Sequence, residues 1–232
     1  MTTIKTSVLV LSQGVFSEIA ATVNRTRNGL ETGVKLFGTV LDDDSAGHAF
    51  VVLAIAGPGD RATHLPAHYS GDADYATDIF SALGSAMPGI KWLGEMHVHP
   101  RGMTWLSAGD RRTVREILTG TDDTVHPKEF IAGIMQRQLG AIEIYPYHFS
   151  RECLEGNPIG LSLVADAAPL IHQARLIAIE KGSSHDRPCI CAQSERSRAA
   201  QGKTFGHHWL RQWRQRLGTY GRALWHRQAH AR

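Results

Sequence analysis

The sequence GEMHVHP at residues 94–100 places two histidines, His97 and His99, two positions apart at the end of an apolar run. Residues two apart on a β-strand point to the same face of a sheet, about 6.6 Å apart at ~3.3 Å per residue. Pro100 disfavours helical backbone at His99 and ends the strand there. This segment therefore requires a strand that ends at two imidazoles facing the same side, and the rest of the fold has to accommodate that pair.

A short polar sequence, SAGD at 107–110, follows this strand and opens a helical pattern. Its aspartate, Asp110, could supply a carboxylate oxygen to a metal held by the two imidazoles, which are the commonest nitrogen ligands in proteins. Three protein ligands with a fourth position open to water is the pattern of catalytic rather than structural zinc. Two other interpretations remain open. An isolated His-x-His pair can occur without a metal, and Ser-x-x-Asp is typical of a capping box, in which Ser107 satisfies free backbone N–H groups.

The hydrophobic pattern predicts strands and helices in alternation. Apolar runs, several of them alternating, predict strands at 5–11, 31–41, 48–56, 90–99, 129–136, 141–147 and 159–164. Apolar residues at helical spacing predict helices at 12–24, where Ser12 is the expected cap, and at 72–83, 107–118 and 169–181. Strands and helices mixed in this order predict an α/β sandwich with a central mixed sheet.

The formal net charge of +3 conceals two oppositely charged parts. Residues 1–194 contain 16 Lys/Arg and 21 Asp/Glu, a net of −5, whereas residues 195–232 contain nine basic residues and one acidic residue, a net of +8. Apolar residues recur at helical spacing from Trp209 to Leu224, with arginines between them, which is typical of an amphipathic helix. Such a helix could bind an acidic partner, a membrane surface or nucleic acid, or pack on its own domain.

These patterns predict four parts along the chain. A catalytic domain is expected over 1–150, a strand–helix extension over 151–181, a linker over 182–202 and a basic helical tail over 203–232. The longest apolar run, 50–57, is far shorter than the ~20 residues that a membrane-spanning helix needs. The three cysteines do not make a disulfide framework. We therefore expect a cytoplasmic protein.

The string HVHPRGMTWLSAGD at 97–110 resembles the signature of the JAMM family of zinc metalloproteases, also called the MPN, JAB or Mov34-like family. The family's second element is a glutamate before a glycine-bearing apolar strand, and the sequence GLETGVKLFG at 29–38, which contains Glu31, is similar to it. The element order also fits over about residues 5–148. Val98 stands where the family often has Ser or Thr, and Lys35 interrupts the apolar strand, but neither lies in the inferred ligand set.

The resemblance implies a role for each residue of the motif. His97, His99 and Asp110 would hold one Zn²⁺ per chain in a JAB/MPN-type mixed sheet sandwiched by helices. Glu31 would activate the zinc-bound water, and Ser107 would donate a hydrogen bond to the developing oxyanion. These residue types suit that chemistry, because a carboxylate can take and return a proton and a hydroxyl can stabilise a forming negative charge.

The implied reaction is hydrolysis of a peptide or isopeptide bond. The expected substrate is a ubiquitin-like protein or its conjugates, since the compact core is similar to prokaryotic deubiquitinase-like members, some of which act in antiphage defence. One alternative is a JAMM-like hydrolase of a small-molecule or sulfur-carrier adduct. Another is a non-catalytic MPN scaffold that only binds partners. The complete set of motif residues favours an enzyme, because a scaffold does not require it.

Several other residues are candidates for a role at or near such a site. Glu18 is an alternative base, although a solvated helix face is the simpler interpretation. Glu95 could face the metal side by strand alternation and is expected to be structural. His64 and His68 could flank a substrate groove or be ordinary surface histidines. Cys189 and Cys191 could form a second metal site or be exposed thiols.

Overall fold

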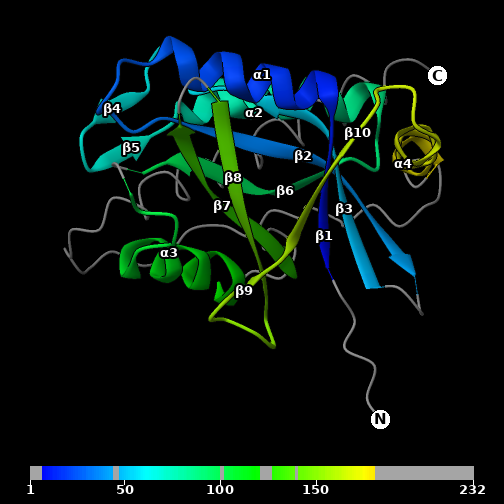
Figure 1. Ribbon diagram of the computed structural model, residues 1–232. Helices are drawn as coiled ribbons and strands as arrows, with labels where there is room; N and C mark the ends of the chain where they lie inside the picture. Colours follow the sequence, from blue (N-terminus) through cyan, green and yellow to red (C-terminus); the bar gives the residue numbers. More distant parts are fainter. Residues whose placement is uncertain (1–6, 44–46, 100–101, 121–126, 139–140, 181–232) are drawn as a thin grey trace, which may run out of the picture.

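The structure is a computed structural model, and it describes residues 7–43, 47–99, 102–120, 127–138 and 141–180. Within these ranges the chain forms a mixed α/β fold of four helices and a large mixed sheet (Figure 1). The predicted mixed sheet with intervening helices is confirmed at this level. The predicted basic tail, the linker, Cys189 and Cys191 lie outside the described residues.

The main sheet has eight strands in the order β10-β1-β3-β2-β6-β7-β8-β9. Their bounds are β1 Val8–Ser12, β2 Gly33–Asp43, β3 Gly47–Ala56, β6 Lys91–Val98, β7 Glu129–Gln138, β8 Ala141–Ser150, β9 Asn157–Pro158 and β10 Gly160–Val164. β1 runs parallel to both β3 and β10, and β6 runs parallel to β7, whereas the other neighbouring pairs are antiparallel. The strand predicted within the extension is therefore β10, which belongs to the main sheet.

The helices begin at side-chain caps that the sequence supplies. They are α1 Gln13–Arg25, α2 Ala73–Ala86, α3 Ala108–Thr119 and α4 Pro169–Glu180. Ser12, Asp72 and Ser107 cap the first three by accepting hydrogen bonds from backbone N–H groups of the first turn. Predicted boundaries are close to the observed ones. α2, however, continues through Gly84, because a glycine inside a helix costs only about 1 kcal/mol and does not end it when the helix packs on a core.

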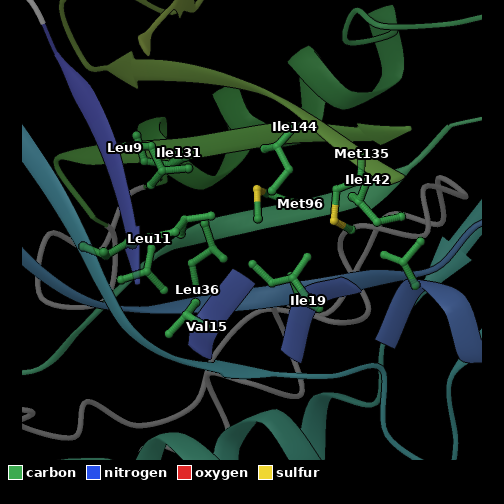
Figure 2. Close-up of a cluster of buried hydrophobic side chains, with 14 of the residues drawn as sticks. Leu9, Leu11, Val15, Ile19, Leu36, Met96, Ile131, Met135, Ile142 and Ile144 are labelled. Atoms are coloured by element: carbon green, nitrogen blue, oxygen red, sulfur yellow. The ribbon is translucent and has the colours of Figure 1, made fainter. Parts of the chain in front are cut away.

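Alternate residues of the strands enter different apolar clusters, which places helices against both faces of the sheet. Leu9, Leu11 and Leu36 join the cluster that α1 covers with Val15 and Ile19 (Figure 2). Strand residues that point to the other face of the sheet, such as Val10 and Phe37, join two further clusters, which α2, α3 and α4 cover. Burying each large aliphatic side chain contributes roughly 1.5–3 kcal/mol to the free energy of folding. These clusters therefore fix the positions of the strand ends, including the end of β6 that carries His97. None of the described helices is both long enough and apolar enough to span a membrane.

A two-stranded hairpin, β4 Thr63–Leu65 and β5 His68–Ser70, was not predicted. The hydrophobic pattern indicates only a loop before α2 in this region. Its strands are three residues long, and Leu65 is the only aliphatic residue in them, so no alternation marks them in the sequence. The hairpin is held by contacts with the segment around Glu31, which are described below.

Gly94 is a position in β6 where the backbone excludes any side chain. Its φ is +153°, and a Cβ placed there would lie 1.9 Å from the carbonyl oxygen of Ile131 in β7. We expect Gly94→Ala to lower the free energy of unfolding by at least ~3 kcal/mol, because backbone of the neighbouring strand cannot move aside without breaking the ladder. Denaturant titration measures this.

The matched control for that substitution is Gly84→Ala. Gly84 lies inside α2, and a Cβ placed there would have no neighbouring atom within 4 Å outside its own helix. Alanine there is expected to stabilise the protein by about 0.5–1 kcal/mol. Equal unfolding midpoints for the two variants would contradict the close approach of β6 and β7.

Candidate metal centre

The two motif histidines lie at the end of β6, as predicted. His97 is paired with Gly33 of β2, and the N–H of Val98 donates to the carbonyl of Thr32 at 2.7 Å. These contacts fix the strand end from which both imidazoles project. His99, which follows the last residue of β6, is buried to 7% exposure. The strand end therefore presents the two side chains to one side, with ring centroids 4.6 Å apart.

Asp110 of α3 completes a group whose geometry fits a small metal ion. Its Oδ1 lies 3.4 Å from His97 Nε2, and its Oδ2 lies 3.1 Å from His99 Nε2. Each of the three residues offers one ligand atom, and these atoms all lie within 4.8 Å of one another. Ligands of a tetrahedral zinc at ~2.0–2.1 Å stand about 3.3–3.4 Å apart. The donor set and its spacing thus fit zinc, although other divalent metals also accept this set.

The helix that carries Asp110 begins with a capping box. Asp110 N–H donates to Ser107 Oγ at 3.2 Å, and Ser107 N–H donates to Asp110 Oδ2 at 2.7 Å. The capping interpretation of Ser-x-x-Asp is therefore correct, and it does not exclude the metal-binding one. The Ser107 hydroxyl accepts from the Asp110 N–H and also bonds to the Asp110 carboxylate, so it donates into the cavity only when its proton turns away from that carboxylate.

The protonation states of these groups suit metal binding. Burial lowers the pKa of His97 to about 4, and His99 and Lys35 lower it further, while Asp110 opposes them. Burial would raise the pKa of Asp110, but hydrogen bonds from His99 and Ser107 and the nearby His97 hold it at about 2. At neutral pH His97 is therefore a neutral imidazole and Asp110 a carboxylate. These are the forms that bind metal ions.

Glu31 lies beside this group, two residues before the Gly33 that pairs with His97. Its side chain lines the same cavity, and the residue is 8% exposed. Burial raises the pKa of its carboxyl to about 7, an effect that His99 opposes and Asp110 reinforces. A carboxyl group that titrates near neutral pH can both accept and return a proton under ordinary conditions.

The turn that leads to Glu31 is held by an arginine from β7. The guanidinium of Arg137 donates to the carbonyl of Thr26 at 2.8 Å, to Asn28 Oδ1 at 3.1 Å and to the carbonyl of Val23. It thereby bonds to acceptors at the end of α1, where the Val23 carbonyl also accepts the N–H of the C-cap Thr26 at 3.3 Å. No sequence pattern marks Arg137, because more than a hundred residues separate it from the turn that it holds.

A cavity of about 470 Å³ opens beside His97, His99 and Asp110. The β4–β5 hairpin and α3, which lie at the same end of the molecule in Figure 1, both line it. Lys35 and Glu95, cross-strand partners one pleat inward from Gly33 and His97, form an ion pair in its wall. Burial lowers the pKa of Lys35 to about 7. Lys35, which interrupts the apolar pattern of β2, is thus part of the cavity.

The structure brings the predicted site residues together. One cavity is lined by all five of them: Glu31, His97, His99, Ser107 and Asp110. Glu95 and His68 line it too, whereas Glu18, the alternative base, is exposed on α1 and is not among the lining residues. His64, which is half-buried, bonds through Nδ1 to the backbone carbonyl of Glu31.

Comparison with known proteins supports no argument about the fold or the function of this chain. No protein-family model matches this sequence, and no curated protein matches it. The chain is similar to the solution structure of a Desulfitobacterium hafniense protein from a structural genomics consortium, at 16% identity and a TM-score of 0.48. That match covers 68% of this chain and 93% of the other. It carries no argument about function, so the chemistry of the site is the basis for any assignment.

The raised pKa of Glu31 has a consequence for the metal-free protein. A carboxyl whose pKa rises from 4.5 to about 7 on folding destabilises the fold increasingly as pH rises through that window. In the presence of chelator, we expect Glu31→Gln to be more stable than the wild type at pH 8 by about 1–2 kcal/mol. The whole pKa shift would correspond to a larger difference, at ~1.4 kcal/mol per pKa unit. We expect a smaller gain in stability because solvent near the carboxyl screens its charge.

Thermal unfolding at several pH values tests this expectation. The gain in melting temperature should shrink as pH falls below 7 and disappear below about pH 4, where the carboxyl is protonated in both the folded and unfolded states. Glu18→Gln, which removes an exposed carboxyl, is the control and should show no such trend. A Glu31→Gln gain that is equal at pH 5 and pH 8 would contradict the burial of an ionised carboxylate.

Proposed function

We propose that this chain is a zinc-dependent hydrolase that cleaves an amide bond, of the peptide or isopeptide type. The observation that carries the proposal is the convergence of His97, His99 and Asp110 within 4.8 Å of one another, in a cavity that Glu31 also lines. Two imidazoles and one carboxylate leave a coordination position for water and substrate, which is typical of catalytic zinc. A scaffold protein would not need a neutral His97 and a carboxyl with a raised pKa in the same cavity.

Each residue has a role that follows from its position. When bound, zinc would polarise the scissile carbonyl and make water a stronger nucleophile at neutral pH. Glu31 accepts a proton as the water oxygen bonds to the carbonyl carbon, and it returns a proton to the nitrogen as the C–N bond breaks. The Ser107 hydroxyl donates to the oxygen on which negative charge develops. The products are a carboxylate and an amine.

The resemblance to JAMM metalloproteases supports a substrate class. On that basis the bond joins the C-terminus of a ubiquitin-like protein to a further peptide or to a lysine, in a prokaryotic conjugation system. The ligand spacing and the position of Glu31 before β2 are what this proposal shares with the family. A sulfur-carrier adduct is the alternative substrate, and the same experiment distinguishes the two.

The test is incubation of the purified full chain with a panel of ubiquitin-like fusions, read by intact mass. The panel should contain linear fusions, lysine-linked conjugates and a sulfur-carrier protein carrying a C-terminal amino acid. We expect one of the macromolecular probes to lose the mass of its leaving group and gain one water, with zinc present. Chelator should stop the reaction, and added zinc should restore it.

Two results would contradict the proposal. Cleavage that continues in excess chelator would exclude a metal-dependent reaction and point to a contaminating protease. Stoichiometric binding of a fusion without any cleavage, in a protein shown to contain zinc, would favour the scaffold alternative. Cleavage confined to the sulfur-carrier adduct would change the substrate class and leave the catalytic roles in place.

A further inference from the structure

Glu31 lies just outside the ladder of the main sheet, yet its backbone is held on both sides by the β4–β5 hairpin. β2 begins two residues later, at Gly33. The N–H of Glu31 donates to the carbonyl of Leu65 at 2.9 Å, and its own carbonyl lies 2.9 Å from Nδ1 of His64. The carbonyl of Gly33 accepts from the Tyr69 hydroxyl at 3.1 Å. The hairpin therefore supplies a partner to every one of these backbone groups.

His64 and Tyr69 act on this segment as a pair. They are directly opposite each other in the hairpin, and their ring centroids are 5.7 Å apart. Alternate carbonyls of an extended chain point the same way, so two neighbouring donors can reach the carbonyls of residues 31 and 33 together. We call these two side chains the hairpin clamp. It links the cavity wall formed by β5 to the backbone of Glu31.

Both members of the hairpin clamp can act as donors. Burial raises the pKa of the Tyr69 hydroxyl, so it keeps its proton over the whole working range. The ring also packs closely, since a Cβ on Gly33 would lie 2.5 Å from Tyr69 Cε1. His64 donates when its proton is on Nδ1, and the carbonyl acceptor favours that tautomer.

We infer that His64 and Tyr69 are positioning residues that fix where the Glu31 carboxylate points. This inference rests on the proposed function, in which Glu31 is the base. Misplacement of a reacting group by about 1 Å can cost ~10²-fold in rate, so a base on a segment outside the ladder needs such support. A hairpin this short is not stable by itself, and its contacts with residues 31–33 hold the hairpin and the base in one arrangement.

The activity test compares variants that remove the donors with one that keeps a donor. The double variant His64→Leu/Tyr69→Phe is expected to lower kcat by ~10–100-fold on the fusion that the wild type cleaves, with KM changed less than ~3-fold. Zinc content should stay at the wild-type value. His64→Gln, which retains an N–H donor, should recover part of the rate. Thr63→Ala, at an exposed position of the same strand, is the control and should behave as the wild type.

A second measurement does not depend on activity. Backbone amide exchange over residues 29–34 should speed up by ~10-fold or more in the double variant, because the hairpin that carries the Leu65 carbonyl, the partner of the Glu31 N–H, loses its side-chain anchors to this segment, while exchange in β6 stays unchanged. Unchanged exchange over 29–34 would overturn the inference. So would a loss of zinc or of β6 protection, since the pair would then be ordinary packing residues. If the wild type cleaves none of the fusions, the proposed function fails, and exchange still decides whether the hairpin clamp holds the Glu31 segment.

Discussion

Wild-type protein is expected to bind about one zinc per chain, and the His97→Ala/His99→Ala double variant is expected to retain almost none. Removing two of three ligands leaves Asp110 as a lone carboxylate, which does not hold zinc against dialysis. Elemental analysis after dialysis against a weak chelator gives the stoichiometry. Hydrolysis of the fusion that the wild type cleaves should fall to background with the metal.

The matched control is His68→Ala. This imidazole lines the same cavity but does not belong to the group of three ligands. Its removal should leave zinc at one per chain. Full zinc in the His97→Ala/His99→Ala protein would mean that the metal sits elsewhere, and the proposed centre would be abandoned.

Glu31→Gln is expected to keep its zinc and to lose turnover by ~10²–10⁴-fold, the usual contribution of a general acid–base group. Glutamine has nearly the same size as glutamate, but it cannot accept a proton from water at neutral pH. Steady-state kinetics on the cleaved fusion, together with metal analysis of the same sample, separates the loss of the base from the loss of the metal.

Glu18→Gln is the control for this substitution, because Glu18 was the alternative base and is exposed on α1. It should retain wild-type turnover. If Glu18→Gln were inactive and Glu31→Gln active, the base would have to come from α1, and the position of Glu31 in the cavity would need a different explanation.

The sequence was sufficient to predict that His97, His99 and Asp110 lie together, because each lies next to a local structural signal. His97 and His99 share a strand face, Pro100 marks where that strand ends, and Ser107 marks where α3 begins. Such signals lie within a few residues of the side chains that they orient. The position of Asp110 facing the imidazoles then follows from one short connection between β6 and α3.

The parts that could not be predicted depend on contacts between distant segments. The hairpin clamp joins residues 64 and 69 to residues 31 and 33, and Arg137 reaches back to the end of α1. Neither interaction leaves a periodic pattern in the sequence. Lys35 did break a pattern, but its partner Glu95 is sixty residues away, and only the register of β2 with β6 reveals the ion pair.

The double use of Asp110 constrains how this chain can diverge. Its carboxylate is one of the three candidate ligands and also accepts from the Ser107 N–H that opens α3, so losing it removes a ligand and a helix cap in one mutational step. A descendant that abandoned the chemistry would keep its fold most readily through asparagine, which retains an acceptor oxygen for the cap and is a poorer ligand for the metal. Among relatives of this chain, asparagine at this position would therefore indicate a lineage in which the candidate metal site was lost while selection still preserved the fold.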